Sequence, residues 1–312
     1  MSHYVIRNYR PSDFKDYVQL HVEAERLEPI GRYISPQVLG YSLGQPNSSP
    51  EKDLFIAEIA GTVVGYVNIR PELGIGRVVL DGLVHPEHRR RGLAPQLFHK
   101  AVHRALGLGA RLAHVKISEG NVAAKALLSR LGFRFIRRFL GLKLELSELH
   151  PPSTEHLGLS CRYLRRGEED KLTEIQNRAF AGTWGYNPNT TEEIAYRLSY
   201  CSPEDVILVC QGDVPIGFCW TRVNLEQHAA TGPSKGIIYM LGVDPHYRGK
   251  GVGRCALLAG LSYLKSRGME VAELTVDGEN KVAHALYESV GFSIWSISEW
   301  YEKALDQPTR TA

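Results

Sequence analysis

The chain has 312 residues, with 37 Lys and Arg against 34 Asp and Glu, and a formal net charge of +3. This balance excludes the concentrated basicity of a dedicated nucleic-acid binder. At about 100–200 residues per domain, the length favours two domains. No run reaches the ~18 uncharged apolar residues of a membrane-spanning helix, and the start lacks the apolar part of a signal peptide. We therefore expect a cytoplasmic protein that binds neither nucleic acid nor membrane.

The five cysteines fall in the second half of the chain and form no C-x-x-C pair. Their odd number and spacing favour neither a disulfide framework nor a zinc site. We expect reduced thiols in the hydrophobic core and no metal. The residues are Cys161, Cys201, Cys210, Cys219 and Cys255.

In chain order, the first half alternates helices and strands. Apolar residues at helical spacing after a Ser12-Asp13 cap signal predict a helix over residues 13–25. Short apolar segments around two glycines predict a pair of middle strands, at 54–58 and 65–67. The remaining predicted elements are a strand over 78–84, a helix over 94–106, a strand over 112–117, a helix over 122–131 and a final strand.

The second half repeats this pattern. Residues 84–94 align with 243–253 at an offset of 159, and the same offset relates Asn121 to Asn280 and residues 131–133 to 290–292. We therefore predict two tandem domains, 1–148 and 159–306, joined by a segment with two adjacent prolines. The second copy has a longer loop between its middle strands, around residues 224–235. The other elements predicted in it are helices over 168–179, 254–267 and 281–290, and strands over 206–210, 237–243 and 271–276.

A glycine-rich turn joins the central strand to the next helix in each copy. In residues 248–253, Arg-Gly-Lys-Gly-Val-Gly, the absence of β-carbons lets backbone N–H groups converge where the helix dipole is positive. Such a turn favours a bound phosphate. It matches neither the P-loop nor the dinucleotide-binding pattern.

The turn and its surroundings resemble the GNAT superfamily of acyl-CoA N-acyltransferases. The pattern Q/R-x-x-G-x-G/A lies between a strand and a helix, and is followed by an Asn-x-x-Ala helix and a Gly-Phe pair. Arg248, Gly251 and Gly253 satisfy it in the second copy, and the first copy carries it at residues 89–94. The resemblance implies a mixed α/β fold and two GNAT-type domains.

The resemblance also implies where acetyl-CoA binds. In that family the strand before the turn pairs with the pantetheine arm, the turn holds the pyrophosphate, and the Asn lies near the thioester. Carried over to the second copy, these residues are Leu241, Gly242, Val243, Arg248, Gly249, Lys250, Gly251, Val252, Gly253, Arg254 and Asn280. In the first copy they are Gly82, Leu83, Val84, Arg89, Arg90, Arg91, Gly92, Leu93, Ala94 and Asn121. Each Asn also fits a helix N-cap.

Tyr287 is the expected catalytic acid. It follows Asn280 by seven residues, about two helical turns, and therefore projects from the same face of the helix. The family commonly places the acid that protonates the departing thiolate at this position. Leu128 stands at the equivalent place in the first copy. We therefore expect a catalytic second domain and a first domain without efficient turnover.

A tandem arrangement with one degenerate half is similar to the mycothiol synthases. The segment 236–245 looks like their Gly-Glu-Val-Tyr-x-x-Gly-Val-Asp-Pro strand, but Ile237 replaces the Glu. Their Leu-Tyr-Val-Asp is here Leu-Thr-Val-Asp, with Thr275 in place of Tyr. We therefore expect the same architecture with a different small-molecule amine as acceptor.

Several choices stay open in the sequence. The base is a water chain or one of Glu204, Asp205, Glu226 and His228. His284 and Glu288 are expected to face solvent or a neighbouring residue on the same helix. Trp184 and Tyr186 either wall the acceptor pocket or pack at a domain interface. The alternative functions are a noncatalytic acyl-CoA sensor and a protein N-acetyltransferase.

Overall fold

A computed structural model describes residues 4–28, 35–149, 158–223 and 233–305. It divides the chain into two compact units. Unit 1 comprises Met1–Ile136 and Trp300–Ala312, and unit 2 comprises Arg137–Glu299. Within the described ranges, no helix combines the length and apolar character needed to cross a membrane.

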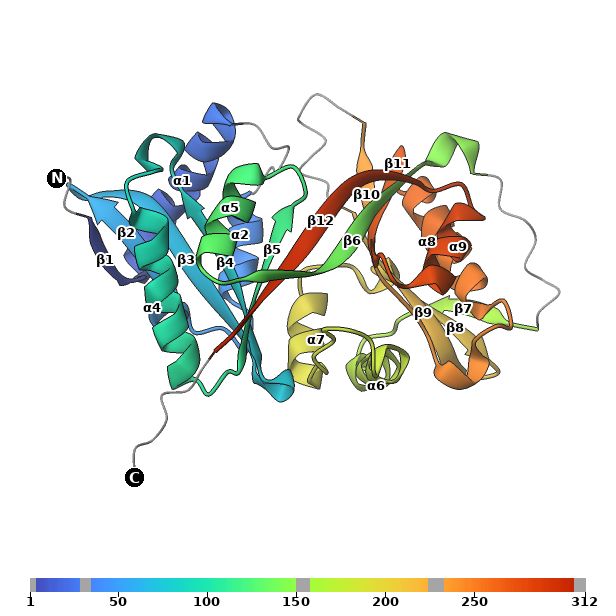
Figure 1. The fold of residues 1–312 in the computed structure, drawn as a ribbon. Coiled ribbons are helices and arrows are strands. Elements are labelled where there is room, and N and C mark those ends of the chain that lie inside the picture. The colour runs from blue at the N-terminus through green and yellow to red at the C-terminus, as the bar shows by residue number, and fades with distance from the viewer. Residues whose placement is uncertain (1–3, 29–34, 150–157, 224–232, 306–312) are drawn as a thin grey trace. The chain divides into compact units, whose positions relative to one another are not determined.

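Unit 1 is a mixed sheet with helices on both faces (Figure 1). Its strand order is β1-β2-β3-β4-β5, followed by residues 300–304 of β12. The strands are β1 (Val5–Asn8), β2 (Leu54–Ile59), β3 (Thr62–Glu72), β4 (Arg77–Val84), β5 (Leu112–Ser118) and β12 (Ser293–Ala304). The helices are α1 (Phe14–Leu27), α2 (Pro36–Leu43), α3 (Pro50–Asp53), α4 (Leu93–Gly107) and α5 (Val122–Arg130).

Unit 2 repeats this plan, and the mixed α/β class with two copies is therefore confirmed. Its strand order is β12-β6-β11-β10-β9-β8-β7. The strands are β6 (Arg134–Glu145), β7 (Ser160–Tyr163), β8 (Val206–Gln211), β9 (Val214–Val223), β10 (Lys235–Val243) and β11 (Val271–Asp277). The helices are α6 (Glu169–Phe180), α7 (Thr191–Leu198), α8 (Val252–Ser266) and α9 (Lys281–Glu288).

The unit boundaries differ from the expected domain limits of 148 and 159. Strand β6 leaves unit 1 after Ile136, and its residues 137–145 pair with β11 of unit 2. Strand β12 leaves unit 2 after Glu299, and residues 300–304 belong to unit 1, where the Leu305 N–H donates to the Arg111 carbonyl. Each copy therefore supplies the strand that the other lacks. A repeat in the sequence does not reveal which sheet a last strand joins.

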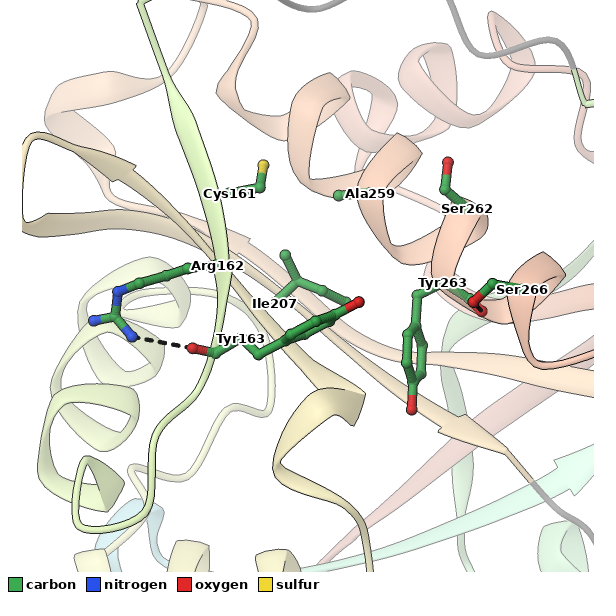
Figure 2. Close-up of a pocket in the computed structure, with 8 residues that line it drawn as sticks. All are labelled: Cys161, Arg162, Tyr163, Ile207, Ala259, Ser262, Tyr263 and Ser266. Carbon is green, nitrogen blue, oxygen red and sulfur yellow. Dashed lines mark hydrogen bonds between the residues drawn. The ribbon is translucent and has the colours of Figure 1, made fainter.

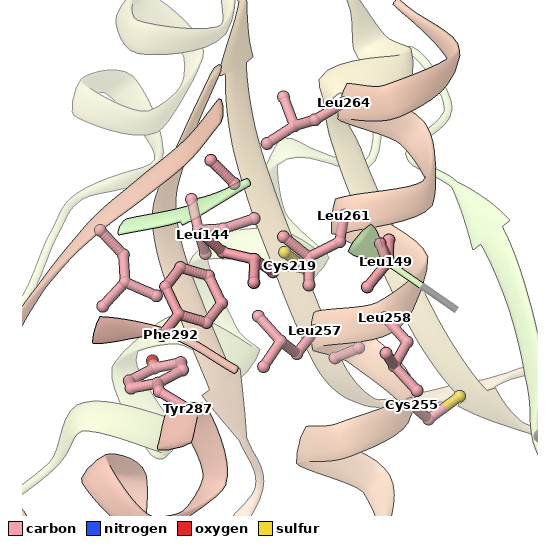
Figure 3. Packing of buried hydrophobic residues seen from close by; sticks show 14 of the residues in the cluster. Leu144, Leu149, Cys219, Cys255, Leu257, Leu258, Leu261, Leu264, Tyr287 and Phe292 are labelled. Carbon is pink, nitrogen blue, oxygen red and sulfur yellow. The ribbon is translucent and has the colours of Figure 1, made fainter. Parts of the chain in front are cut away.

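Alternate residues of the middle strands face two separate cores. In unit 2, Cys219 of β9 packs with α8, whereas its neighbours Phe218 and Trp220 pack with α6 and α7 on the other face. Figure 3 shows the first of these cores, which contains Leu257, Leu261 and Leu264 of α8 among its members. Unit 1 divides its sheet in the same way between α4 and α1.

The same ion pair ties the first strand to the first helix in both units. In unit 2, Glu168 accepts two bonds from the Arg162 guanidinium, at 2.7 and 3.0 Å, and one from the Arg165 backbone N–H at 3.0 Å. In unit 1, Arg7 makes the equivalent pair with Asp13 at 2.7 Å. The Arg162 guanidinium lowers the pKa of Glu168 from its usual 4.5 to about 2.

Replacing Glu168 with glutamine is expected to lower the free energy of unfolding by about 2 kcal/mol at pH 7, because it removes a buried charge-assisted pair. Because the pKa of Glu168 is lower in the folded state, its ionised carboxylate stabilises the fold above pH 4.5. This contribution is lost as the pH falls toward 2. Urea unfolding of wild type and E168Q should therefore differ about half as much at pH 3 as at pH 7.

Glu174→Gln is the matched control on the same helix, because its pair with Arg178 is exposed and 3.7 Å long. We expect it to change stability by less than about 0.5 kcal/mol. Equal losses for E168Q and E174Q would show that the buried pair contributes nothing specific.

Candidate active site

Strands β10 and β11 separate toward the end that carries the glycine-rich turn. They pair only from Lys235 to Ile237, opposite Val271 to Glu273. Beyond that point β10 bonds to β9 alone, and β11 continues along β6. The facing edges from Ile238 to Val243 thus keep backbone groups that can pair with an added extended chain. The three predicted strand residues Leu241, Gly242 and Val243 lie on this edge.

A β-bulge at Tyr239 distinguishes this strand from its counterpart in unit 1. The β9–β10 register shifts between Ile238 and Met240, so Tyr239 has no partner on β9. A bulge turns backbone groups out of the ladder, and bulges are frequent beside active sites. In unit 1, β4 separates from β5 after Leu80 in the same way, but its pairing with β3 is regular throughout.

The glycine-rich turns of the two units share one backbone conformation. Gly249 and Gly251 have φ angles of +74° and +80°, and Arg90 and Gly92 have +59° and +78°. Such left-handed positions suit glycine, and Arg90 is one of only two non-glycine residues to adopt one in the described chain. A β-carbon built on Gly251 meets no atom within 4 Å, so the turn opens onto free space.

The turn of unit 2 presents a row of unused hydrogen-bond donors. The N–H groups of residues 249–254 donate to no atom of the described chain, and the first bond of α8 runs from Cys255 to Gly251 at 3.0 Å. No side chain caps this helix. Free N–H groups at a helix start bind anions. In unit 1, Pro95 stands at the position of Arg254 and supplies no such donor.

The cationic side chains of the turn help to shape it. Arg248 donates to the carbonyls of Val243, at 3.4 Å, and Ala179, at 2.7 Å, and so ties the turn to β10 and α6. Arg89 makes the equivalent bond to Val84, at 3.0 Å, and pairs with Glu28.

The other predicted turn residues divide between surface and core. Lys250 lies over the Tyr247 ring at 5.3 Å, and Arg254 donates to Ser289 of α9 at 2.9 Å. Val252 and Leu93 are buried, Gly253 and Ala94 are partly buried, and Arg91 is exposed.

Asn280 and Asn121 are exposed N-caps. The Asn280 side chain accepts from the Ala283 N–H at 3.1 Å, and Asn121 accepts from Ala124 at 3.0 Å. Asn280 therefore starts the helix that carries Tyr287, and Asn121 starts the helix that carries Leu128. The amide N–H₂ of each cap points away from this bond and remains a potential donor to a ligand.

Tyr287 lies on the inner face of α9, with 7% of its surface exposed. Its ring packs edge-on against Phe292 at 5.7 Å, as Figure 3 shows. The neighbouring Leu286 approaches the space beside Gly253 and Val243, so α9 borders the turn and the end of β10. The Tyr287 hydroxyl makes no hydrogen bond to the described residues. Burial raises its pKa well above the usual value.

Unit 1 has a hydrocarbon where unit 2 has this phenol. Leu128 is 2% exposed and belongs to the core beneath α4. Both positions are therefore packing positions, and only unit 2 places an acidic group there.

Two of the candidate bases, Glu204 and Asp205, directly precede β8, and the other two lie outside the described residues. Asp205 accepts from the Tyr263 hydroxyl at 2.8 Å and from the Ser202 N–H, so it fixes the start of β8. Burial raises its pKa. Glu204 is exposed beside it. Glu226 and His228 fall in residues 224–232, which the structure does not describe.

His284 and Glu288 face each other on α9, with His284 Nδ1 3.4 Å from the carboxylate of Glu288. This agrees with the expected contact along the helix surface. No group of three or more His, Cys, Asp and Glu in the described ranges is arranged to hold a metal ion.

Trp184 and Tyr186 belong to two different clusters within unit 2. The Arg137 guanidinium lies 5.3 Å over the Trp184 ring, and Phe139 of β6 packs beside the same ring at 5.9 Å. Tyr186 stacks on Phe180 at 5.2 Å, and its hydroxyl donates to Asn177 at 2.7 Å. Trp184 therefore packs against β6, while Tyr186 fixes the loop after α6.

Sequence reasoning missed the bulge at Tyr239 and the role of Arg137. Arg137 also binds Asp277 at 3.0 Å and Glu279, and so connects β6 to the end of β11. The repeat assigns this arginine to the first copy, and no pattern in the sequence places it in unit 2.

Comparison with known proteins also finds two copies of one domain in the chain. The family model "Acetyltransferase (GNAT) family" matches residues 17–133 and again 170–292. A mycothiol acetyltransferase of Stackebrandtia nassauensis is 30% identical over 296 residues, which cover 93% of this chain and 95% of that protein.

Two solved structures are similar in fold. A GCN5-related N-acetyltransferase from Sphaerobacter thermophilus has a TM-score of 0.74 at 19% identity, covering 97% of this chain and 96% of that chain. A tandem GNAT protein from the clavulanic acid biosynthesis pathway has a TM-score of 0.74 at 17% identity, covering 98% and 100%. The chain therefore belongs to the GNAT acetyltransferase family, and it carries two copies of the domain.

Proposed function

We propose that unit 2 transfers an acetyl group from acetyl-CoA to the primary amine of a small molecule. The observation that carries this proposal is the row of unpaired N–H groups at residues 249–254, set at the open end of a strand whose edge is free from Ile238 onward. A diphosphate fits the first feature and an extended pantetheine arm fits the second.

Tyr287 has the properties of a hydrogen-bond donor to the departing thiolate. A free tyrosine has a pKa near 10 and a thiol near 8.5, so complete proton transfer from the phenol costs ~2 kcal/mol. Burial of Tyr287 raises its pKa and increases this cost. The phenol therefore stabilises the leaving sulfur by a hydrogen bond, and the proton released by the amine completes the thiol.

The acceptor differs from the one named by the relatives. Ile237 and Thr275 are exposed and stand where the mycothiol synthase pattern has Glu and Tyr. An acceptor that relied on these polar groups would lose hydrogen bonds worth about 1–3 kcal/mol each.

A screen of primary amines with acetyl-CoA and purified protein, read as released thiol, tests this function. We expect at least one small amine to raise thiol release more than tenfold over hydrolysis, and lysine-containing peptides to give no comparable rate. Transfer to peptides alone would favour a protein N-acetyltransferase instead.

A second function receives support from unit 1 alone. Its turn keeps the open conformation at Arg90 and Gly92, but Leu128 removes the phenol. These features fit acyl-CoA binding without turnover. Acetyl-CoA binding with no transfer to any amine in the screen would extend this function to the whole chain.

A further inference from the structure

Two thiols lie side by side at the start of α8. The Sγ atoms of Cys161 and Cys255 are 3.5 Å apart. A disulfide bond requires ~2 Å, so a relative movement of about 1.5 Å would join them. Cys161 is on β7, an edge strand that pairs with β8, and Cys255 is in the first turn of α8, so closing the bond moves both elements toward each other.

Cys161 lines a pocket of about 290 Å³ (Figure 2). Cys161 and Tyr163 of β7 form one side, and Ser262 and Ser266 of α8 form the other. Cys255 precedes the lining residue Ala259 by one helical turn and lies on the same face of α8. Cys161 is exposed and is therefore the thiol that reacts first with a reagent from solvent. Cys255 is buried and reacts second.

We propose that a low-molecular-weight disulfide, R–S–S–R, oxidises Cys161 and Cys255 to an intramolecular disulfide. The Cys161 thiolate attacks one sulfur of the reagent, its S–S bond breaks, and one RS⁻ leaves. The Cys255 thiolate then attacks Sγ of Cys161 and releases the second RS⁻. The two RS⁻ groups take up the two cysteine protons, so the reagent is reduced to two thiols by the two electrons that the cysteines lose.

The remaining thiols do not share this arrangement. Cys210 and Cys219 are buried in the cores. Cys201 is partly exposed, but its Sγ donates to the carbonyls of residues 197 and 198. Burial, followed by the contact with Cys255, raises the pKa of Cys161, so its thiolate is scarce at neutral pH and the reaction with a small disulfide should become faster as the pH rises.

Oxidation of the pair acts on the cofactor turn, and this consequence rests on the proposed function. The Cys255 N–H makes the first hydrogen bond of α8, to Gly251. Drawing Cys255 toward β7 displaces that first turn and misaligns its free N–H groups. Loss of one well-aligned bond to a charged phosphate weakens acetyl-CoA binding about tenfold.

The test uses the full chain and oxidised glutathione as the small disulfide. Peptide mapping should find a single Cys161–Cys255 linkage and an intact mass lower by two hydrogens. Cys161→Ser should abolish the linkage, whereas Cys201→Ser should leave it unchanged. A stable glutathione adduct on Cys161 without the linkage, or reaction at Cys201 alone, would overturn the proposal.

Titration of acetyl-CoA into reduced and oxidised protein tests the consequence. We expect about tenfold weaker binding after oxidation, and none of this change in the Cys161→Ser variant. Equal affinities would overturn the effect on the turn. Failure of the reduced protein to bind acetyl-CoA would contradict the proposed function. The peptide map needs no cofactor and would still decide whether the Cys161–Cys255 disulfide forms.

Discussion

Replacing Gly251 with aspartate is expected to weaken acetyl-CoA binding by unit 2 and to lower the kcat/KM of acetyl transfer about 100-fold. Aspartate tolerates the left-handed conformation that Gly251 adopts at φ +80°, and its β-carbon meets no atom within 4 Å. The fold should therefore persist. The new carboxylate lies among the free N–H groups of residues 249–254, where it competes with a phosphate for them and repels it.

Gly92→Asp in unit 1 is the matched control. Gly92 has φ +78° and equally empty surroundings, so the local cost of the substitution is the same. We expect thiol release to change less than about twofold in G92D, because unit 1 lacks the phenol. The two variants are compared by steady-state thiol release and by thermal unfolding. A loss in G92D matching that in G251D would contradict the assignment of catalysis to unit 2.

Replacing Tyr287 with phenylalanine is expected to lower kcat about 100-fold while changing the KM for acetyl-CoA less than about twofold. In the proposed function, the hydroxyl acts on the leaving sulfur in the transition state, and the turn binds the cofactor. Because burial raises its pKa, the phenol stays protonated in the folded protein through the alkaline range. The ratio of the two kcat values should therefore stay constant up to about pH 10.

Stability separates this chemical role from packing. The Tyr287 hydroxyl has no hydrogen-bond partner among the described residues, so Y287F should unfold within about 0.5 kcal/mol of wild type. Tyr287→Leu, which copies Leu128 of unit 1, should lose as much kcat as Y287F. Unchanged turnover in Y287F would show that Tyr287 is a core aromatic and no acid.

The features that repeat locally were predictable from the sequence. The 159-residue offset relates both glycine-rich turns and both Asn caps, and the structure gives the two turns the same left-handed positions at Gly92 and Gly251. Helical periodicity located α4 and α8 to within about two residues. These predictions succeed because turn geometry, capping and amphipathic spacing depend on residues close together in the chain.

Features that depend on distant residues were not predictable. The assignment of β6 to unit 2 depends on its pairing with β11, which lies far along the chain. The bulge at Tyr239 changes no local pattern, because its register is set by β9. Cys161 was expected among core thiols but is exposed, and its neighbour Cys255 lies 94 positions away.

Amide hydrogen exchange with and without saturating acetyl-CoA tests the central claim most directly, because that claim concerns backbone N–H groups. We expect peptides covering residues 248–254 and 239–243 to exchange at least tenfold more slowly with acetyl-CoA, and more slowly with coenzyme A alone over 248–254. Unchanged exchange over both segments, under conditions where titration shows that acetyl-CoA is bound, would contradict the account.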